Sequence, residues 1–372
     1  MNADNNLPVW HISCLTALPA AAFAGGRKGP GGGGPSRREV PAWRRVRRRL
    51  WWLLLRIVAT VAAWLPPSVG RAAGMALARL ALVVRPRERR LALANLELAL
   101  PEQDGDVRRR LLDEAAAAAG RNLYDALAAG RLLARGGAVR DEAGPDGRTL
   151  LAVLADESAH GRGVLVLSGH LGCWELFGAW LASELAAAGR GPLHVITGVV
   201  RNPAVDRWLA GRRRGLGLVP LPRTAGVAPL LRCLRDGGVL AALVDQNTGV
   251  DSRPVPFFGR PAPTPSGPAR LAVRLDVPVV VATIAREPGG SGHVVTHGPV
   301  WRAPAGLEAD AAVDDCLREV NRQLEERVRR NPAEWVWYHR RWDGPREAGN
   351  AVNAGSDAAA TTTGAGRGAD AL

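Results

Sequence analysis

Residues 163–175 read Gly-Val-Leu-Val-Leu-Ser-Gly-His-Leu-Gly-Cys-Trp-Glu, and this stretch decides the fold. The run from Gly163 to Ser168 is short and apolar, which is typical of a strand buried on both faces. The next residues, 173–188, form an expected helix that ends at Gly189. His170 therefore stands in the turn at the carboxyl end of a strand, the edge at which α/β sheets bind ligands.

The same alternation of strand and helix continues along the chain. Further buried strands are expected at residues 193–200, 238–244 and 277–284, and further helices at 108–133, 202–214, 227–235 and 309–330. This alternation predicts an α/β fold in which a mostly parallel or mixed sheet is flanked by helices. We expect four regions: a disordered leader at 1–36, a basic membrane-associated helical region at 37–90, the α/β domain at 91–343 and a disordered tail at 344–372.

The chain has 372 residues, with 49 basic and 35 acidic side chains and a formal net charge of +14. That excess of positive charge suits nucleic acid, an anionic membrane or an acidic protein as a partner. The four cysteines form no CxxC pair and no zinc-ligand spacing with histidine. We therefore expect reduced thiols, no structural metal and a protein that faces the cytosol.

The positive charge is concentrated near one apolar segment. Residues 37–90 contain 14 arginines and two glutamates, a net +12, while the rest of the chain is close to neutral. These arginines bracket residues 50–65 (LWWLLLRIVATVAAWL), which are few for a bilayer span of about 20 residues. Tryptophans at 51, 52 and 64 suit the lipid headgroup zone, and each arginine near an anionic leaflet adds about 1 kcal/mol of attraction. The pattern favours a membrane-associated helix, either spanning or interfacial. The alternatives are a buried helix with a basic cap and a nucleic-acid-binding surface.

His170 and Glu175 are the first candidates for catalysis. Within one regular helix they would lie about 140° apart, so His170 is expected before the helix and Glu175 in its early turns, pointing back. In that arrangement the carboxylate accepts from one ring nitrogen and leaves the other nitrogen basic, able to remove a proton from a hydroxyl. A histidine that caps a helix beside a surface glutamate is the alternative.

Several blocks resemble one family in order along residues 43–343. The stretch 168–175 resembles the HX4E box of PlsC-like glycerolipid acyltransferases, and its HxGxWE form resembles the lipid A biosynthesis late acyltransferases, or lauroyl/myristoyl transferases. Further blocks resemble this family: residues 95–102 (NLELALPE), 200–207 (VRNPAVDR), 238–246 (GVLAALVDQ), 255–259 (VPFFG), 264–272 (TPSGPARLA), 277–286 (VPVVVATIAR) and 321–342, which ends in WVWYHRRW. Two positions depart from the family pattern, Cys173 before Trp174 and Asn247 after Gln246.

The resemblance implies transfer of a fatty acyl group from an acyl thioester to a hydroxyl of a lipid A precursor, with no cofactor and no metal. It implies that His170 is the general base and Glu175 its orienting partner. The implied substrate-binding residues are Arg201, Arg207, Asp245, Phe257 and Phe258, where Arg201 holds acidic groups or the oxyanion, Asp245 shapes the acceptor side and the phenylalanines line an acyl tunnel.

The resemblance also implies the partners. The donor is carried by acyl carrier protein or coenzyme A, and basic residues between 207 and 223 suit either carrier. The implied acceptor is a lipid, and the implied location is the cytoplasmic face of the inner membrane. No nucleic acid is expected as a partner. Three alternatives remain: the same transfer to a phosphatidylinositol mannoside-like glycolipid or lysophospholipid, a lipid hydrolase that releases fatty acid, and a nucleic-acid-binding protein.

Overall fold

The structure, a computed structural model, describes residues 42–200, 202–248, 250–290 and 292–342. The expected leader at 1–36 and tail at 344–372 lie outside these residues. The helices are α1 (Ala42–Trp64), α2 (Pro67–Val84), α3 (Pro86–Ala99), α4 (Gly105–Leu127), α5 (Ala129–Ala134), α6 (Leu150–Ala159), α7 (Trp174–Ala187), α8 (Pro203–Gly215), α9 (Ala228–Arg235), α10 (Gly267–Leu275) and α11 (Ala309–Arg330). The strands are β1 (Val139–Asp141), β2 (Val164–Ser168), β3 (Leu193–Thr197), β4 (Leu218–Pro222), β5 (Val239–Leu243), β6 (Ser252–Phe257), β7 (Arg260–Pro265), β8 (Val279–Arg286) and β9 (His293–His297).

Seven of these strands form one sheet, in the order β1-β9-β8-β2-β5-β3-β4. All neighbouring pairs are parallel except β8 and β9, which are antiparallel. β6 and β7 form a separate antiparallel hairpin. The expected α/β architecture with a mostly parallel sheet is therefore confirmed.

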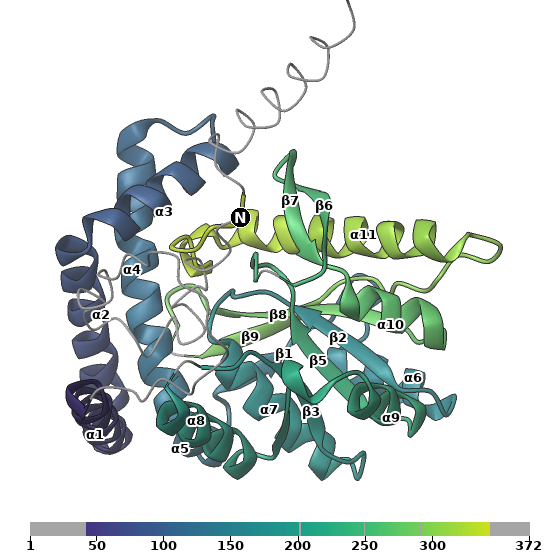
Figure 1. Cartoon of the computed structure of the whole chain (residues 1–372), viewed down its shortest axis with the longest axis horizontal. Coiled ribbons are helices and arrows are strands. Elements are labelled where there is room, and N and C mark those ends of the chain that lie inside the picture. The colour runs from purple at the N-terminus through teal and green to yellow at the C-terminus, as the bar shows by residue number, and fades with distance from the viewer. Residues whose placement is uncertain (1–41, 201, 249, 291, 343–372) are drawn as a thin grey trace, which may run out of the picture.

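Both faces of the sheet are covered, as Figure 1 shows. One core lies between the sheet and α5, α6 and α7, and the other between the sheet and α3, α4, α9, α10 and α11. All five side chains of β2 are buried, because its alternate residues enter opposite cores. β2 thus carries the following turn to the middle of one sheet edge.

β5 lies between β2 and β3, although it follows both of them in the sequence. The chain moves outward from β2 to β3 and β4 and then returns to β5, so the direction of winding reverses beside β5. The pairing of β3 with β5 covers only Leu193 to Val195, whereas β3 and β4 pair over five residues. The two strands therefore separate toward their carboxyl ends, and such a reversal point is the preferred ligand crevice of an open α/β sheet.

α1 and α2 lie at one side of the molecule against α4, away from the sheet (Figure 1). α2 approaches α4 closely through glycines: a Cβ added at Gly74 would lie 2.3 Å from the Gly120 carbonyl oxygen. One turn away, Arg71 donates to the buried Asp125 carboxylate of α4 at 2.8 Å. α2 is therefore fixed along α4 by close packing and by an ion pair.

Large apolar side chains remain exposed along α1 and α2. They include Leu50, Leu53, Leu54, Ile57, Val61 and Trp64 on α1 and Val69, Leu77, Leu80, Val83 and Val84 on α2. Among the described residues, α2 is the one helix long and apolar enough to cross a bilayer, while α1 has a shorter apolar segment at Trp52–Ala62. The apolar segment at 50–65, which belongs to α1, is thus less suitable for spanning than α2.

We predict that Gly120→Val destabilises the protein by about 1–3 kcal/mol, because a side chain there would meet the Gly74 carbonyl oxygen and force α2 away from α4. The free energy of unfolding in urea measures the effect. Ala73→Val places the same side chain at an exposed position of α2 and serves as the control. Equal stability of the two variants would contradict the close approach described above.

Candidate active site

The turn after β2 holds His170 against Asp245, which follows β5. Asp245 Oδ1 lies 2.7 Å from His170 Nδ1, and Asp245 Oδ2 accepts from the His170 backbone N–H at 2.7 Å. A carboxylate can only accept, so Nδ1 carries the ring proton and Nε2 is left as the basic nitrogen. Both side chains are buried, with exposures of 8% for His170 and 1% for Asp245.

The C-terminal segment completes this pair. The Trp335 indole N–H donates to Asp245 Oδ2 at 2.8 Å, and the Val336 N–H donates to the His170 carbonyl at 3.2 Å. His339 Nε2 lies 3.2 Å from the Asp245 backbone oxygen. The closing signature at 335–342 therefore holds both members of the pair in place.

Two glycines permit the tight turn around His170. A Cβ at Gly169 would lie 2.9 Å from Asp245 Oδ2. Gly172 has a φ of +61°, and a Cβ there would lie 2.1 Å from the Ile284 carbonyl oxygen. Any side chain at either position would push the turn away from β5 or β8, so the Gly-His-Leu-Gly order is required by the geometry.

The pKa of Asp245 is held well below its usual range. Burial by itself would raise that pKa, but the facing His170 charge, the His170 hydrogen bond and the Trp335 indole outweigh it. Asp245 thus remains an anion, and that anion stabilises the positive charge which His170 acquires when Nε2 takes a proton.

Glu175 pairs with a different residue from the one expected. Its carboxylate accepts two hydrogen bonds from Arg213 of α8, one of them at 3.1 Å from Arg213 Nε. Burial would raise the pKa of Glu175, yet the charge and hydrogen bond of Arg213 lower it below its usual value. The predicted hydrogen bond from the imidazole to Glu175 is therefore wrong. His170 Nδ1 is bonded to Asp245 instead, and the Glu175 carboxylate is bonded to Arg213.

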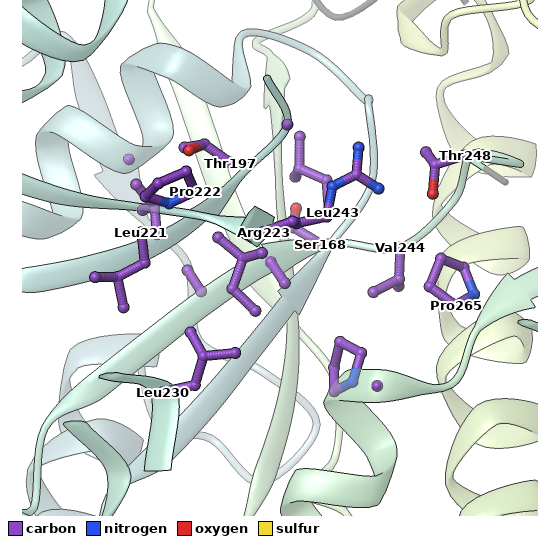
Figure 2. Close-up of a pocket in the computed structure, with 18 of the residues that line it drawn as sticks. Ser168, Thr197, Leu221, Pro222, Arg223, Leu230, Leu243, Val244, Thr248 and Pro265 are labelled. Carbon is purple, nitrogen blue, oxygen red and sulfur yellow. The ribbon is translucent and has the colours of Figure 1, made fainter. Parts of the chain in front are cut away.

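A cavity of about 400 Å³ opens beside His170. His170, Trp174 and Glu175 line it, together with residues of β3, β4, β5, α7, α9 and α10. Ala241 and Val195 in its wall face one core and Ala242 and Ile196 face the other, so the cavity reaches both faces of the sheet where β3 and β5 separate. Figure 2 shows Leu221, Leu230, Val244 and Pro265 around it. The wall is mainly apolar, as a hydrocarbon ligand requires.

Two polar side chains in the wall have unsatisfied atoms. Gln246 Nε2 and Thr248 Oγ1 are buried without a hydrogen-bond partner, and both residues line the cavity. Gln246 is only 3% exposed and directly follows Asp245. Buried donors are usually satisfied, so these groups are suited to bind a ligand atom near His170. Sequence reasoning missed both as donors, although Gln246 stood within a quoted block.

The other expected site residues are distributed differently. Arg201 lies outside the described residues. Arg207 is exposed on α8 and does not line the cavity. Phe257 and Phe258 were expected to line an acyl tunnel, and this is wrong: they pack with Trp335 and Trp342 in the core and are absent from the cavity wall. The β6–β7 hairpin carries them over α11 and away from β3 and β4.

The other basic residues between 207 and 223 have different surroundings. Arg212 donates to the Ala126 and Leu127 carbonyls and lies over the Trp208 ring, so it has a structural role. Arg223 lines the cavity, where Figure 2 shows it, together with the exposed Pro222, Val227 and Val250. These exposed members of the wall mark the mouth of the cavity.

Cys173 does not enter the cavity. It is buried, its thiol lies 3.3 Å from the Asn122 carbonyl of α4, and it is not part of the cavity wall. Burial raises the pKa of Cys233 to about 11 and that of Cys316 to about 12, as expected for unreactive thiols. Over the described ranges, no group of three or more His, Cys, Asp or Glu side chains is arranged to hold a metal ion.

Comparison with known proteins matches most of this chain to one protein family. A family model described as bacterial lipid A biosynthesis acyltransferase matches residues 40–343. A phosphatidylinositol mannoside acyltransferase of Mycolicibacterium smegmatis is 24% identical over 190 residues, which are 49% of this chain and 57% of that protein. The protein of the same name from Mycobacterium tuberculosis H37Rv is 26% identical over 191 residues, or 50% and 56% of the two chains. The chain thus spans little more than half the length of these curated relatives.

We predict that His339→Gln makes stability less sensitive to acid. Burial lowers the pKa of His339 to about 4, whereas an unfolded histidine titrates near about 6.5. As pH falls through this window the unfolded chain binds the proton first, so stability is complete above the window and is lost within it. Glutamine keeps an N–H donor for the Asp245 carbonyl but does not titrate there.

Urea unfolding of both proteins at about pH 7 and about pH 5 measures this difference. The wild type should lose more free energy of unfolding between the two conditions than the variant. An identical loss in both proteins would contradict a neutral, buried His339.

Proposed function

This chain belongs to the bacterial lipid A biosynthesis acyltransferase family, and we propose that it transfers a fatty acyl group from an acyl thioester to a hydroxyl of a glycolipid. The observation that carries the proposal is a buried His170–Asp245 pair that opens on a largely apolar cavity. We also propose that its mixed sheet is the PlsC-like fold of glycerolipid acyltransferases. Acyl transfer needs a base for the attacking hydroxyl and an apolar site for the acyl chain, and both meet at His170.

The reaction proceeds in two steps at His170 Nε2. This nitrogen accepts the proton of the acceptor hydroxyl while the oxygen attacks the thioester carbonyl carbon, which forms a C–O bond and a tetrahedral oxyanion. Collapse of the oxyanion breaks the C–S bond, and the departing sulfur takes the proton from Nε2. Asp245 holds the Nδ1–H tautomer and balances the transient imidazolium. General-base assistance of this kind accelerates reactions by about 10²–10⁴-fold.

Gln246 and Thr248 supply hydrogen bonds for the oxyanion. Their buried, unsatisfied atoms lie in the wall that His170 shares. Donors preset in a site that excludes water stabilise a developing oxyanion by about 3–4 kcal/mol each. Glu175 and Arg213 form the part of the wall between α7 and α8, where Arg213 leaves Glu175 without a free negative charge beside the thioester.

The donor approaches through the mouth of the cavity. Acyl carrier protein is acidic and coenzyme A carries phosphates, and exposed arginines suit either. Arg223 lines the cavity, and Arg207 and Arg214 are exposed on α8. Arg201, between the described Val200 and Asn202, is proposed for the same role on the family resemblance. Guanidinium groups bind phosphates and carboxylates through forked hydrogen bonds.

Two acceptors are consistent with the comparisons. The family description, over residues 40–343, supports a lipid A precursor. The two curated relatives support a phosphatidylinositol mannoside as the second candidate. Both are glycolipids with free hydroxyls, so the same catalytic pair serves either reaction.

The N-terminal helices are proposed to lie in the membrane interface on the cytoplasmic side of the inner membrane. α2 is packed along α4 through Gly74 and Gly120 and through Arg71 and Asp125. Since α4 also carries charged residues, including the exposed Asp113 paired with Arg79 of α2, a spanning α2 would draw these charges into the bilayer. The exposed apolar residues of α1 and α2 instead enter the acyl boundary, and exposed arginines of the described N-terminal helices lie near anionic headgroups: Arg49, Arg56, Arg87, Arg89 and Arg90.

Mass spectrometry of membrane lipids from cells with and without the gene tests the function. Loss of one acyl chain from lipid A on deletion supports the first acceptor, and loss of one from phosphatidylinositol mannosides supports the second. Complementation with His170→Ala should fail in either case. Unchanged glycolipids, or release of free fatty acid without an acceptor, would contradict acyl transfer to a glycolipid.

We predict that Asp245→Asn lowers kcat by about 10³–10⁴-fold, since an amide cannot hold the Nδ1–H tautomer as a carboxylate does. Glu175→Gln keeps an acceptor for Arg213 and should lower kcat less than about tenfold. Steady-state transfer from an acyl thioester measures both. A larger loss in Glu175→Gln than in Asp245→Asn would reverse the assignment of the orienting residue.

Membrane docking is tested by sedimentation with vesicles of phosphatidylglycerol and phosphatidylcholine. Leu80→Glu, at an exposed position of α2, should weaken binding about tenfold or more, because a charge replaces an apolar side chain that enters the interface. Leu307→Glu makes the same change at an exposed leucine outside the N-terminal helices and should have no effect. Equal binding of all three proteins would refute docking through α2.

A further inference from the structure

α7 carries a glycine where it lines the cavity. Gly178 lies one turn from Trp174 and one turn from Leu181, and all three residues form part of the wall. Its φ is not positive, so the backbone does not require glycine there. Glycine inside a helix costs about 1 kcal/mol relative to alanine. The glycine at this position is therefore explained by what lies beside the helix and not by its backbone conformation.

Gly178 packs against β4 beside the cavity. A Cβ added at Gly178 would stand 3.0 Å from Leu218 Cδ2, a distance tighter than ordinary van der Waals contact. Leu218 is the first residue of β4 and also lines the cavity. Gly178 is therefore already in contact with Leu218, and a larger side chain at residue 178 has to displace Leu218 or extend into the cavity that both residues line.

The cavity extends from His170 along this side of the sheet as far as Gly178 and Leu218. It begins at His170, beyond the carboxyl end of β2, and includes Leu193 and Leu218 at the amino ends of β3 and β4. Because these strands are parallel, the two ends are separated by about 13 Å, or four residues at about 3.3 Å each. We call this part the α7 arm; its wall is apolar and consists of Phe177, Gly178, Leu181, Leu193, Val195, Leu218 and Ala241.

Gly178 lies partway along the α7 arm. At about 1.5 Å per residue, it is about 6 Å along the helix from Trp174, which contacts the His170 ring edge to face, and about 5 Å before Leu181. Gly178 is half-buried, whereas Leu181 and Leu193 have no exposed surface, so the accessible part of the arm ends beside Gly178 and Leu218.

We propose that Gly178 determines how long an acyl chain the enzyme transfers. The thioester carbonyl lies at His170, and the hydrocarbon tail ends against Gly178 and Leu218. A larger residue at 178 fills this end of the arm and leaves space only for a shorter tail. This inference rests on the proposed acyl transfer and names the residue that limits its donor.

The test compares wild type, Gly178→Ala and Gly178→Leu with acyl thioesters of graded chain length and one acceptor. In Gly178→Leu, kcat/KM for the longest donors that the wild type uses should fall by about tenfold or more, because several methylenes lose their contacts. Short donors should lose less than about threefold, and Gly178→Ala should lie between. A uniform loss at all chain lengths in a folded variant would overturn the proposal.

Gly211 offers a matched control. It is an exposed glycine in α8, and a Cβ added there meets no atom within 4 Å. Gly211→Ala and Gly211→Leu should keep the chain-length profile of the wild type. If they shift the profile as Gly178→Leu does, the effect does not come from the α7 arm.

A binding measurement separates this inference from the proposed function and does not depend on turnover. Free fatty acids of graded length displace a fluorescent fatty acid from wild type and from Gly178→Ala, whose folding circular dichroism confirms. The optimum should move to shorter chains in the variant, and an unchanged optimum overturns the role of Gly178. If the wild type binds fatty acids but transfers none, the proposed acyl transfer is contradicted. The displacement profile then still tests whether Gly178 limits the length of the bound chain.

Discussion

The buried carboxylate of Asp245 is the interaction on which the site depends. It accepts from the His170 ring, from the His170 backbone N–H and from the Trp335 indole, so it joins the turn after β2, the end of β5 and the C-terminal segment. A buried anion is tolerated only when such partners surround it. The hydrogen bonds that offset the desolvation of Asp245 also set the imidazole tautomer of His170. The same contacts are therefore needed both for stability and for the proposed chemistry.

α8 connects this site to the N-terminal helices. Its Arg213 holds Glu175 at the cavity wall, while its Arg212 bonds to the end of α4 and its Trp208 packs against the cluster that includes Ala59 and Ala62 of α1. The helices proposed to touch the membrane thus share one contiguous set of contacts with the cavity. A lipid acceptor held at the bilayer surface would meet the enzyme on the side where these elements lie.

The sequence was informative where local chemistry and fold agreed. The apolar run of β2 and the helix that follows it predicted the strand and the turn at His170, and the strand–helix alternation predicted the parallel sheet. β1, β4, β6, β7 and β9 were not among the expected strands. β4, β6 and β7 contain prolines, which argue against a strand in a sequence, although an edge strand and a hairpin both tolerate proline. The partner of His170 could not be found by spacing, since Asp245 is 75 residues away and meets it only after the sheet forms. Spacing allowed Glu175 as the partner of His170, but Arg213, on another helix, forms an ion pair with the Glu175 carboxylate.

The tautomer of His170 tests the central claim most directly. Nitrogen-15 chemical shifts of the histidine rings, with His170→Asn used to assign the signals, distinguish a protonated ring nitrogen from a bare one. The account predicts that neutral His170 carries its hydrogen on Nδ1, facing Asp245, and has a bare Nε2 facing the cavity. In Asp245→Asn this preference should weaken, whereas in Glu175→Gln it should persist. A hydrogen on Nε2 in the neutral wild-type protein would contradict the account.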